Sequence, residues 1–298
     1  MSNNFYRAFE DRYRGNKELI KSRLITYIPF LEKIKDVNTN PKAIDLGCGR
    51  GEWLELLSAN GFIAKGVDLD ESMLEDCKEK GFDVKLQDAI ESIKSLDDSS
   101  VELISGFHIV EHIPFEDIQT LVQEALRVLT PAGLLILETP NPENIQVATS
   151  GFYIDPTHTR PIPSQLLSFL PEYYGFKRTK ILRLQEENNL KNSEFTTIEN
   201  IINGASPDYA VIAQKNAKNE TLELFDECFS KDYGLTIDTL TLRFENRLKS
   251  IENQINESNN RAIKAEQQII SLLNSNSWRI TKPLRALSNL VRKLINKN

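Results

Sequence analysis

The chain has 298 residues, of which 40% are hydrophobic, and it carries 36 Lys and Arg against 43 Asp and Glu, a formal net charge of -7. This composition is typical of a folded globular protein. The negative charge excludes a globally basic nucleic-acid binder, so no nucleic-acid partner is expected. Three cysteines, Cys48, Cys77 and Cys228, are too few and too scattered for a disulfide framework or a cysteine-rich zinc site.

The first 38 residues are expected to form a helical lid over the core. Aromatic and basic residues mix at the start of this segment, and apolar residues then recur at helical spacing as far as Ile34. The start has no apolar core of a signal peptide, and no segment has the run of about 18 apolar residues that a spanning helix needs. The sequence therefore predicts a cytoplasmic location.

Residues 39–220 show strand and helix patterns in alternation. Strands are expected over Ala43–Leu46, Ala64–Leu69, Asp83–Gln87, Val101–Phe107, Leu134–Glu138, Arg178–Leu184 and Tyr209–Ala213. Helices are expected over Glu52–Ala59, Glu71–Lys80, Phe115–Leu129 and Ser164–Tyr173. Such alternation with short connections predicts an α/β domain with a parallel sheet covered by helices. Because the last two strands are joined by a loop, they are expected to form an antiparallel hairpin at one edge.

Residues 221–275 lack any strand pattern and are expected to form a coiled coil. One heptad frame runs over five heptads through Ile237, Thr241, Phe244, Leu248, Ile251, Ile255, Ser258, Ala262, Ala265, Ile269 and Leu272. Heptads of this length favour self-association, so a homo-oligomer is expected. An amphipathic helix packed on the first domain is the alternative interpretation.

Residues 276–298 contain six basic residues and no acidic one. Apolar residues, including Trp278, recur between them at roughly helical spacing. A basic amphipathic helix with a tryptophan is typical of an element that lies on an anionic membrane surface. A helix that binds a protein partner has the same pattern.

The most specific motif is a glycine-rich loop between a strand and a helix, Asp45-Leu46-Gly47-Cys48-Gly49-Arg50-Gly51. Glycines let the backbone approach a ligand closely, and the helix N-terminus that follows favours negative charge. The spacing is that of neither a dinucleotide fingerprint nor a phosphate-binding Walker loop.

Polar residues also follow the next strands. Asp68 and Leu69 end the second strand, where a carboxylate can accept hydrogen bonds from ribose hydroxyls. Asp88 and Ala89 follow the third strand, where a polar side chain can reach a purine edge, and Phe107 ends the fourth. The sequence therefore predicts a nucleoside pocket at the carboxyl edge of the sheet.

These motifs resemble those of the class I S-adenosylmethionine-dependent methyltransferases, in the order that this family has them. The resemblance covers residues 40–215 and implies a Rossmann-like seven-stranded sheet, with S-adenosylmethionine as the cofactor. It implies that the cofactor is bound by Asp45, Gly47, Cys48, Gly49, Asp68, Leu69, Asp88, Ala89 and Phe107. Arg14, together with Arg7, Arg12 and Tyr13, is expected to cover the cofactor carboxylate or a sugar phosphate, since arginine suits either anion.

A narrower resemblance links the chain to methyltransferases of bacterial surface-polysaccharide (O-antigen) gene clusters. It rests on the segments FYRAFEDRYRG, SGFHIVEHIPF, ETPNPEN and FYIDPTH. The segment SWRITKPLR near the end is similar to the ends of proteins from the same clusters, including glycosyltransferases. This resemblance implies a glycan acceptor and a glycosyltransferase partner at the inner face of the cytoplasmic membrane.

All three histidines fall where the class I fold has its active site. Spacing of three and four predicts that His108, Glu111 and His112 share one face of a helical turn, with His158 in a later loop. Ubiquinone-pathway and small-RNA O-methyltransferases are similar here and bind a divalent metal, although His108 replaces a glutamate. The resemblance implies Glu111, His112, His108 and His158 as metal ligands. A metal-free base, His158 or His112, and purely structural roles remain alternatives.

The leading hypothesis is therefore an O-methyltransferase that acts on a sugar hydroxyl of a surface polysaccharide, with its non-reducing end as one candidate position. Two alternatives stay open: an O-methyltransferase whose acceptor is a small molecule of the quinone type, and an inactive scaffold that recruits glycosyltransferases. Intact glycines and Asp68 argue against the scaffold.

Overall fold

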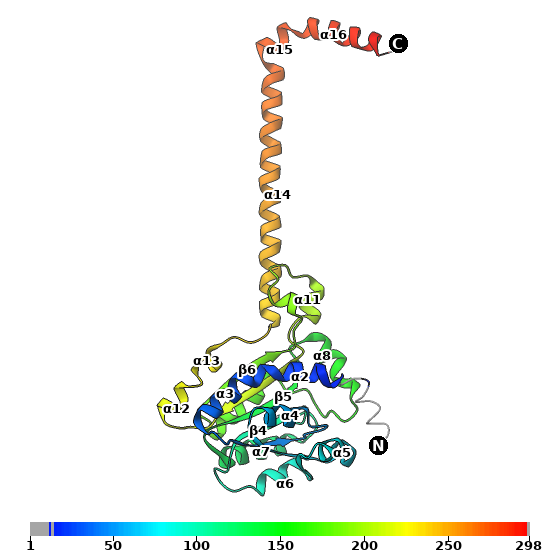
Figure 1. Ribbon diagram of the computed structural model, residues 1–298. Helices are drawn as coiled ribbons and strands as arrows, with labels where there is room; N and C mark the ends of the chain where they lie inside the picture. The colour runs from blue at the N-terminus through cyan, green and yellow to red at the C-terminus, as the bar shows by residue number, and fades with distance from the viewer. Residues whose placement is uncertain (1–11, 13–14, 297–298) are drawn as a thin grey trace. The chain divides into compact units, whose positions relative to one another are not determined.

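The computed structural model describes residue 12 and residues 15–296, which belong to two compact units (Figure 1). The first unit extends to Thr241 and the second comprises Leu242–Asn298. The predicted lid residues Arg7, Tyr13 and Arg14 lie outside the described residues.

The first unit is built on a seven-stranded mixed sheet with the strand order β3-β2-β1-β4-β5-β7-β6. The strands are β1 (Lys42–Leu46), β2 (Ile63–Asp68), β3 (Asp83–Leu86), β4 (Val101–Phe107), β5 (Leu129–Pro140), β6 (Arg178–Leu184) and β7 (Asp208–Gln214). β1 to β5 run parallel, whereas β7 is antiparallel to both β5 and β6. The predicted sheet and its antiparallel edge hairpin are therefore confirmed.

One predicted strand is longer than expected. β5 begins at Leu129, which pairs with Val101, and continues to Pro140. The prediction began only at Leu134, because Pro131 and Gly133 in between are residues that usually interrupt a strand. A shift of register between Val101 and Leu103 accommodates these residues at the beginning of β5.

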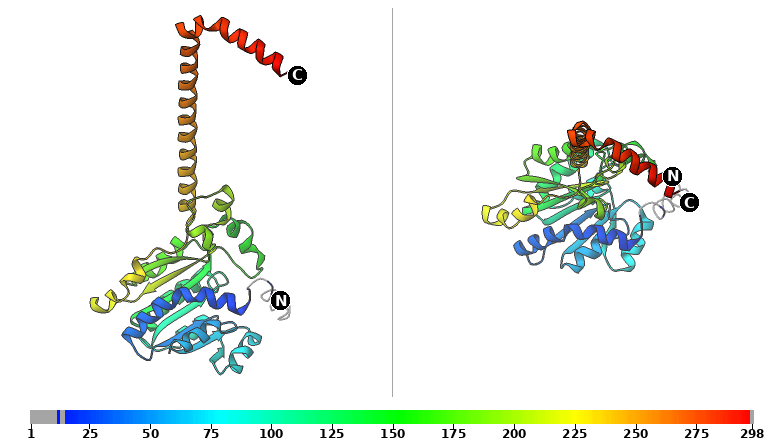
Figure 2. Two further views of the ribbon diagram at one scale, coloured as in Figure 1. Left: turned by 45° about the horizontal axis from the view of Figure 1, so that its top comes forward. Right: turned by 90° about the horizontal axis from the view of Figure 1, so that it is seen from above.

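Helices cover both faces of the sheet (Figures 1 and 2). Those described in the first unit are α2 (Lys17–Leu24), η1 (Ile25–Tyr27), α3 (Ile28–Val37), α4 (Glu52–Ala59), α5 (Glu71–Glu79), α6 (Ala89–Lys94), α7 (Phe115–Val128), α8 (Ile145–Thr149), η2 (Gly151–Ile154), α9 (Ser164–Tyr174), α10 (Asn188–Lys191), α11 (Ile198–Asn203), α12 (Asn219–Glu223) and α13 (Asp226–Ser230). α6, α7 and α9 pack on one face of the sheet, and η1, α3 and α4 on the other. Alternate residues of β5 serve the two cores: Leu135 and Leu137 face the first, Leu134 and Ile136 the second.

The sequence predicted that the first domain ends at residue 220, but in the structure the first unit continues to Thr241. Leu222 on α12 and Phe225 and Cys228 at α13 are buried, and Phe225 and Cys228 belong to the core that contains η1 and α3. Leu235 is buried in a smaller cluster with Leu240. The segment that precedes α14 is therefore part of the first unit, and only the later part of the predicted coiled coil belongs to the second.

The second unit is helical. α14 (Ile237–Asn274) begins in the first unit and has 38 residues, which corresponds to about 57 Å of helix at 1.5 Å per residue. α15 (Asn276–Ile280) and α16 (Lys282–Ile295) follow it. Between them the Arg285 guanidinium stacks on the Trp278 ring at 3.7 Å. Across the described part of the chain, none of the helices combines the length and the apolar character that crossing a membrane requires.

Candidate active site

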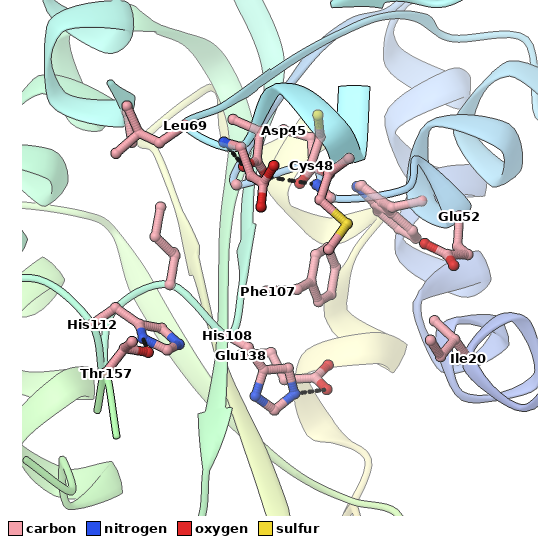
Figure 3. Close-up of a pocket in the computed structure, with 18 of the residues that line it drawn as sticks. Ile20, Asp45, Cys48, Glu52, Leu69, Phe107, His108, His112, Glu138 and Thr157 are labelled. Atoms are coloured by element: carbon pink, nitrogen blue, oxygen red, sulfur yellow. Dashed lines mark hydrogen bonds and ion pairs between the residues drawn. The ribbon is translucent and has the colours of Figure 1, made fainter. Parts of the chain in front are cut away.

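A pocket of about 950 Å³ lies at the carboxyl ends of β1, β2, β4 and β5 (Figure 3). At one end it is lined by residues of the glycine-rich loop and of the ends of β2 and β3, including Asp45, Gly47, Cys48, Gly49, Asp68, Leu69, Asp88 and Ala89. At the other end it is lined by His108, His112, Glu138, Asp155, Thr157, His158, Gln185 and Asp208. Among the described residues, the pocket therefore brings together those predicted to bind the cofactor and those predicted for catalysis or metal binding, except Glu111.

The glycine-rich loop has a backbone that only glycine adopts readily. Gly47, Gly49 and Gly51 have φ angles of +74°, +51° and +79°. The loop amides of Gly47 and Cys48 donate to the carbonyl oxygen of Val67 at 2.8 and 2.9 Å, which seats the loop on β2. Gly66 allows this contact, because a Cβ atom at Gly66 would lie 2.7 Å from the Cys48 Sγ. No sequence motif predicts this role of Gly66.

Asp68 is fixed at the pocket wall by two backbone amides. Its Oδ2 accepts a hydrogen bond from Gly49 N at 2.8 Å, and its Oδ1 accepts one from Asp70 N at 2.9 Å. An ionised carboxylate has about four lone-pair sites, so it can still accept hydrogen bonds from a ligand. Asp68 therefore shapes the glycine-rich loop and also presents a carboxylate to the pocket.

The other predicted cofactor residues have structural partners as well. Asp45 is buried at 2% exposure and accepts a hydrogen bond from Ser105 Oγ at 2.8 Å. Asp88 caps α6 by accepting hydrogen bonds from the amides of Ile90 and Glu91. Phe107 packs edge to face against Tyr27 and Trp53, while Leu69 is exposed at the pocket rim.

The structure offers a cation that sequence reasoning missed. Among the described residues that line the pocket, Arg23 on α2 is the only arginine or lysine. The predicted Arg14 is not described, so its role stays a prediction. Arg23 was overlooked because it lies within an ordinary amphipathic helix and belongs to no motif.

The three clustered histidine and glutamate residues do not share a helical face. His108 has a φ of +53°, and residues 108–114 form turns rather than a helix before α7 begins. His112 and Thr157 lie together on one side of the pocket, whereas His108 and Glu138 face each other on another (Figure 3). The predicted metal ligands therefore divide between two groups. Glu111, His112 and His158 form one group, and His108 lies in the other with Glu138 and Asp208, which were not predicted; in each group the ligand atoms lie within 4.8 Å of one another.

Hydrogen bonds fix which nitrogen of His112 and of His158 carries the proton. The Thr157 hydroxyl donates to the Asp155 carboxylate at 2.6 Å, so its oxygen accepts from His112 Nδ1 at 2.9 Å. His158 Nδ1 lies 2.6 Å from the carbonyl oxygen of Phe152, which can only accept. In its neutral form each ring therefore has its lone pair on Nε2.

Burial favours the neutral form of His112. Burial lowers the pKa of His112 below its ordinary value, despite the Glu111 carboxylate nearby. Asp155 stays ionised, because two hydrogen bonds from Thr157 outweigh its burial and lower its pKa. The rings of His112 and His158 are in contact, with their centroids 4.7 Å apart. Two adjacent imidazoles are thus available to accept a proton or to bind a metal.

Glu111 is completely buried beside these rings. Its Oε1 accepts a hydrogen bond from His108 Nδ1 at 3.1 Å, and its Oε2 accepts one from Thr139 Oγ1 at 2.9 Å. Although burial opposes ionisation, His108 lowers the pKa of Glu111. Two imidazole nitrogens and one carboxylate form a donor set that suits a divalent transition metal.

In the second group, which contains His108, Glu138 and Asp208, only His108 was predicted from the sequence. Glu138 ends the predicted fifth strand and is buried at 5% exposure. It accepts hydrogen bonds from Tyr27 and, at 3.2 Å, from Gln185 Nε2, and His108 Nε2 lies 3.6 Å away. Although burial opposes the charged form of His108, the carboxylates of Glu111 and Glu138 raise the pKa of His108 well above its ordinary value. Glu138 and Asp208 are far apart in the sequence, so no spacing could have predicted their meeting.

Comparisons with known proteins agree with this geometry. The model of a methyltransferase domain matches residues 44–137. The crystal structure of a SAM-dependent methyltransferase from Archaeoglobus fulgidus is 35% identical, covers 71% of this chain and 100% of its own, and has a TM-score of 0.62.

Two curated relatives match over shorter stretches. A probable S-adenosylmethionine-dependent methyltransferase from Mycolicibacterium smegmatis is 28% identical over 134 residues, 45% of this chain and 51% of that protein. A ubiquinone biosynthesis O-methyltransferase from Methylococcus capsulatus is 31% identical over 105 residues, 34% of this chain and 44% of that protein. The chain thus spans about half the length of the curated relatives it matches. With the whole Archaeoglobus fulgidus chain covered at 35% identity, this chain belongs to the S-adenosylmethionine-dependent methyltransferases.

Proposed function

We propose that the protein transfers a methyl group from S-adenosylmethionine to a sugar hydroxyl of a bacterial surface polysaccharide, at the non-reducing end of the glycan. The observation that carries this proposal is the polarity of the pocket beyond the glycine-rich loop. That end is lined by three histidines, three carboxylates, Thr157 and Gln185. Such side chains hydrogen-bond a hydroxyl-rich acceptor, whereas a quinone ring needs a flat apolar surface.

The two imidazoles account for oxygen as the methylated atom. An alcohol becomes an effective nucleophile when its proton is accepted in the transition state. The Nε2 atom of His158 or His112 accepts that proton while the hydroxyl oxygen attacks the methyl carbon. The carbon–sulfur bond breaks and its electron pair stays on sulfur, which leaves S-adenosylhomocysteine. S-adenosylmethionine supplies an already activated methyl group, so in-line positioning is the protein's other task.

A divalent metal fits beside these imidazoles. Glu111, His112 and His158 would hold it, and the hydrogen bonds of the two Nδ1 atoms leave both Nε2 atoms oriented as ligands. A metal there would favour ionisation of the acceptor hydroxyl. His108 is not part of this set, because its Nδ1 donates to Glu111 and its Nε2 faces Glu138.

The quinone-type acceptor remains the second candidate, since one curated relative carries the name of a ubiquinone biosynthesis O-methyltransferase. Formation of S-adenosylhomocysteine from a panel of methyl glycosides and from catechol separates the two. Glycan from a deletion strain should also lose the mass of one methylene group. Turnover of catechol alone would replace the sugar proposal, and no binding of S-adenosylmethionine would leave the inactive scaffold.

We further propose that the second unit mediates self-association and attaches the enzyme to an anionic membrane or to a glycosyltransferase. Along α14, Leu248, Ile251, Ile255, Ile269 and Leu272 of the heptad frame are all more than 40% exposed. An exposed apolar seam of this length is costly in water and favours pairing with a second helix. On α16 the apolar residues Leu284, Leu287, Val291 and Leu294 are likewise exposed, with Arg285 and Arg292 on the same helix.

Two truncations are expected to separate these roles. Removal of residues 277–298 should abolish binding to phosphatidylglycerol vesicles but leave the oligomer intact, because each basic residue near an anionic surface contributes about 1 kcal/mol. Removal of residues 242–298 should in addition give a monomer, and it spares the buried Leu222, Phe225 and Cys228. Sedimentation with vesicles and light scattering measure the two effects. The double variant Arg285→Glu/Arg292→Glu is the matched control for charge. A full-length chain that is monomeric and does not bind these vesicles would refute both self-association and membrane attachment.

A further inference from the structure

Asp208 lines the pocket, although no sequence motif predicts it there. It is the first residue of β7 and pairs with Pro140 at the end of β5 and with Leu184 at the end of β6. Because β7 is antiparallel to β5, its beginning lies at the carboxyl edge of the parallel strands. Asp208 therefore lines the same pocket as His108 and Glu138, on the side away from the glycine-rich loop.

The carboxylate of Asp208 differs from its neighbour Glu138 in having no fixed partner. Glu138 is hydrogen-bonded by Tyr27 and Gln185. From the described residues, by contrast, the Asp208 side chain receives neither a hydrogen bond nor an ion pair within 4 Å. Asp208 is partly exposed where it lines the pocket, so its carboxylate can accept a hydrogen bond from a ligand there.

Charged groups of both signs face Asp208. Glu138 and Glu111 oppose its negative charge, whereas His108 and the Arg23 guanidinium favour it. A neutral hydroxyl, such as that of the sugar proposed above, can donate a hydrogen bond to this carboxylate.

We propose that the Asp208 carboxylate selects the acceptor by accepting a hydrogen bond from a sugar hydroxyl other than the one that is methylated. This inference rests on the sugar acceptor proposed above. Glu138 and Gln185 position the wall around it, while Asp208 itself contacts the acceptor. A site built to hydrogen-bond a hydroxyl discriminates strongly against an analogue that lacks it, since the buried acceptor is then left unpaired.

Asp208→Asn keeps the shape of the side chain and provides the test in the full-length protein. The probes are methyl α-mannopyranoside, methyl α-rhamnopyranoside and methyl β-galactopyranoside, with S-adenosylhomocysteine formation as the readout. We expect the KM for the best of these probes to rise roughly tenfold, because the asparagine amide makes a neutral hydrogen bond in place of a charge-assisted one. The Kd for S-adenosylmethionine should stay within twofold. Asp97→Asn, an exposed aspartate outside the pocket, is the matched control and should change neither value.

Monodeoxy analogues of the best probe identify the hydroxyl. With the wild-type enzyme, one analogue should show the same rise in KM, and Asp208→Asn should add nothing further for that analogue alone. A purely structural role of Asp208 would instead raise the KM of every analogue by the same factor. This comparison therefore separates contact with the acceptor from a general effect on the fold.

Stability provides an independent readout. Burial, reinforced by Glu138, raises the pKa of Asp208 to about 6 despite His108 and Arg23. Since the pKa in the unfolded chain is about 3.9, the folded state binds more protons between these values and loses stability as the pH rises through this window. Asp208→Asn should therefore raise the Tm at pH 7.5, and this gain should disappear near pH 4.

Three results would overturn the inference. Equal KM values for Asp208→Asn and Asp97→Asn would show that Asp208 does not read the acceptor, while sugar methylation by the wild type would still stand. Weakened binding of S-adenosylmethionine would place Asp208 on the cofactor side. Transfer to catechol alone, or to none of the probes, would remove the sugar acceptor and this inference with it.

Discussion

Replacing His158 with alanine is expected to lower the turnover number about 100-fold to 10,000-fold, the range for loss of a general base, while the Kd for S-adenosylmethionine stays unchanged. The reason is geometric. His158 Nδ1 is held by the carbonyl of Phe152, and the ring lines the acceptor end of the pocket with its Nε2 4.0 Å from the Asp155 carboxylate. Turnover with the best methyl glycoside and calorimetry with S-adenosylhomocysteine measure the two quantities.

His112→Ala should have an effect of the same kind, and Thr157→Val should have a smaller one because it removes only the partner that orients the ring. Since the pKa of His112 is lowered, its ring stays neutral below the ordinary value of about 6.5, and turnover should fall only as the pH drops further. Inhibition by a chelator that a divalent cation reverses would support the metal, and indifference would support the metal-free base. Wild-type turnover in both histidine variants would exclude either role.

The affinity for the cofactor is expected to fall at least tenfold, and up to several hundredfold, in Asp68→Ala. A charge-assisted hydrogen bond contributes about 1.5–3 kcal/mol, so the loss of one such bond to a ribose hydroxyl corresponds to roughly tenfold to a few hundredfold in affinity. The structure adds a second cause, because Asp68 also accepts hydrogen bonds from Gly49 N and Asp70 N. Loss of the carboxylate thus removes ligand contacts and loosens the glycine-rich loop together.

Calorimetric titration with S-adenosylhomocysteine measures this loss. Asp83→Asn is the matched control, since Asp83 is a surface residue that pairs with Lys65 and does not line the pocket. Asp68→Asn separates charge from hydrogen bonding, because the amide oxygen still accepts from the two backbone amides. An unchanged Kd in Asp68→Ala would mean that the cofactor binds elsewhere.

The sequence predicted the sheet well because its strands have local signals. Buried parallel strands are short apolar runs, and each is bounded by glycine or polar residues. The residues at the cofactor end of the pocket could be predicted equally well, because the glycine-rich loop, Asp68 and Asp88 each follow a strand directly. Short helices such as α6 and α12 were not predicted, because they contain too few turns to show a period.

The catalytic end could be predicted only in part. The spacing of His108, Glu111 and His112 suggested one helical face, but these residues form turns, and the ring of His108, which has a left-handed backbone, lies between Glu111 and Glu138. Asp208 reaches the pocket through the antiparallel register of β7 with β5, which depends on pairing between distant segments. Contacts of this kind are set by tertiary structure and leave no local pattern.

The position of His108 between two carboxylates has a consequence for how the pocket responds to change. Tyr27, Glu138, His108, Glu111 and Thr139 form one continuous chain of polar contacts. Within a low-dielectric interior, members of such a chain polarise one another, so their energies do not add. We therefore expect a change of charge at Glu138 to alter the electrostatic environment of Glu111, beside His112 and His158. Under the proposed roles, a substitution at Glu138 should change acceptor specificity and proton acceptance together.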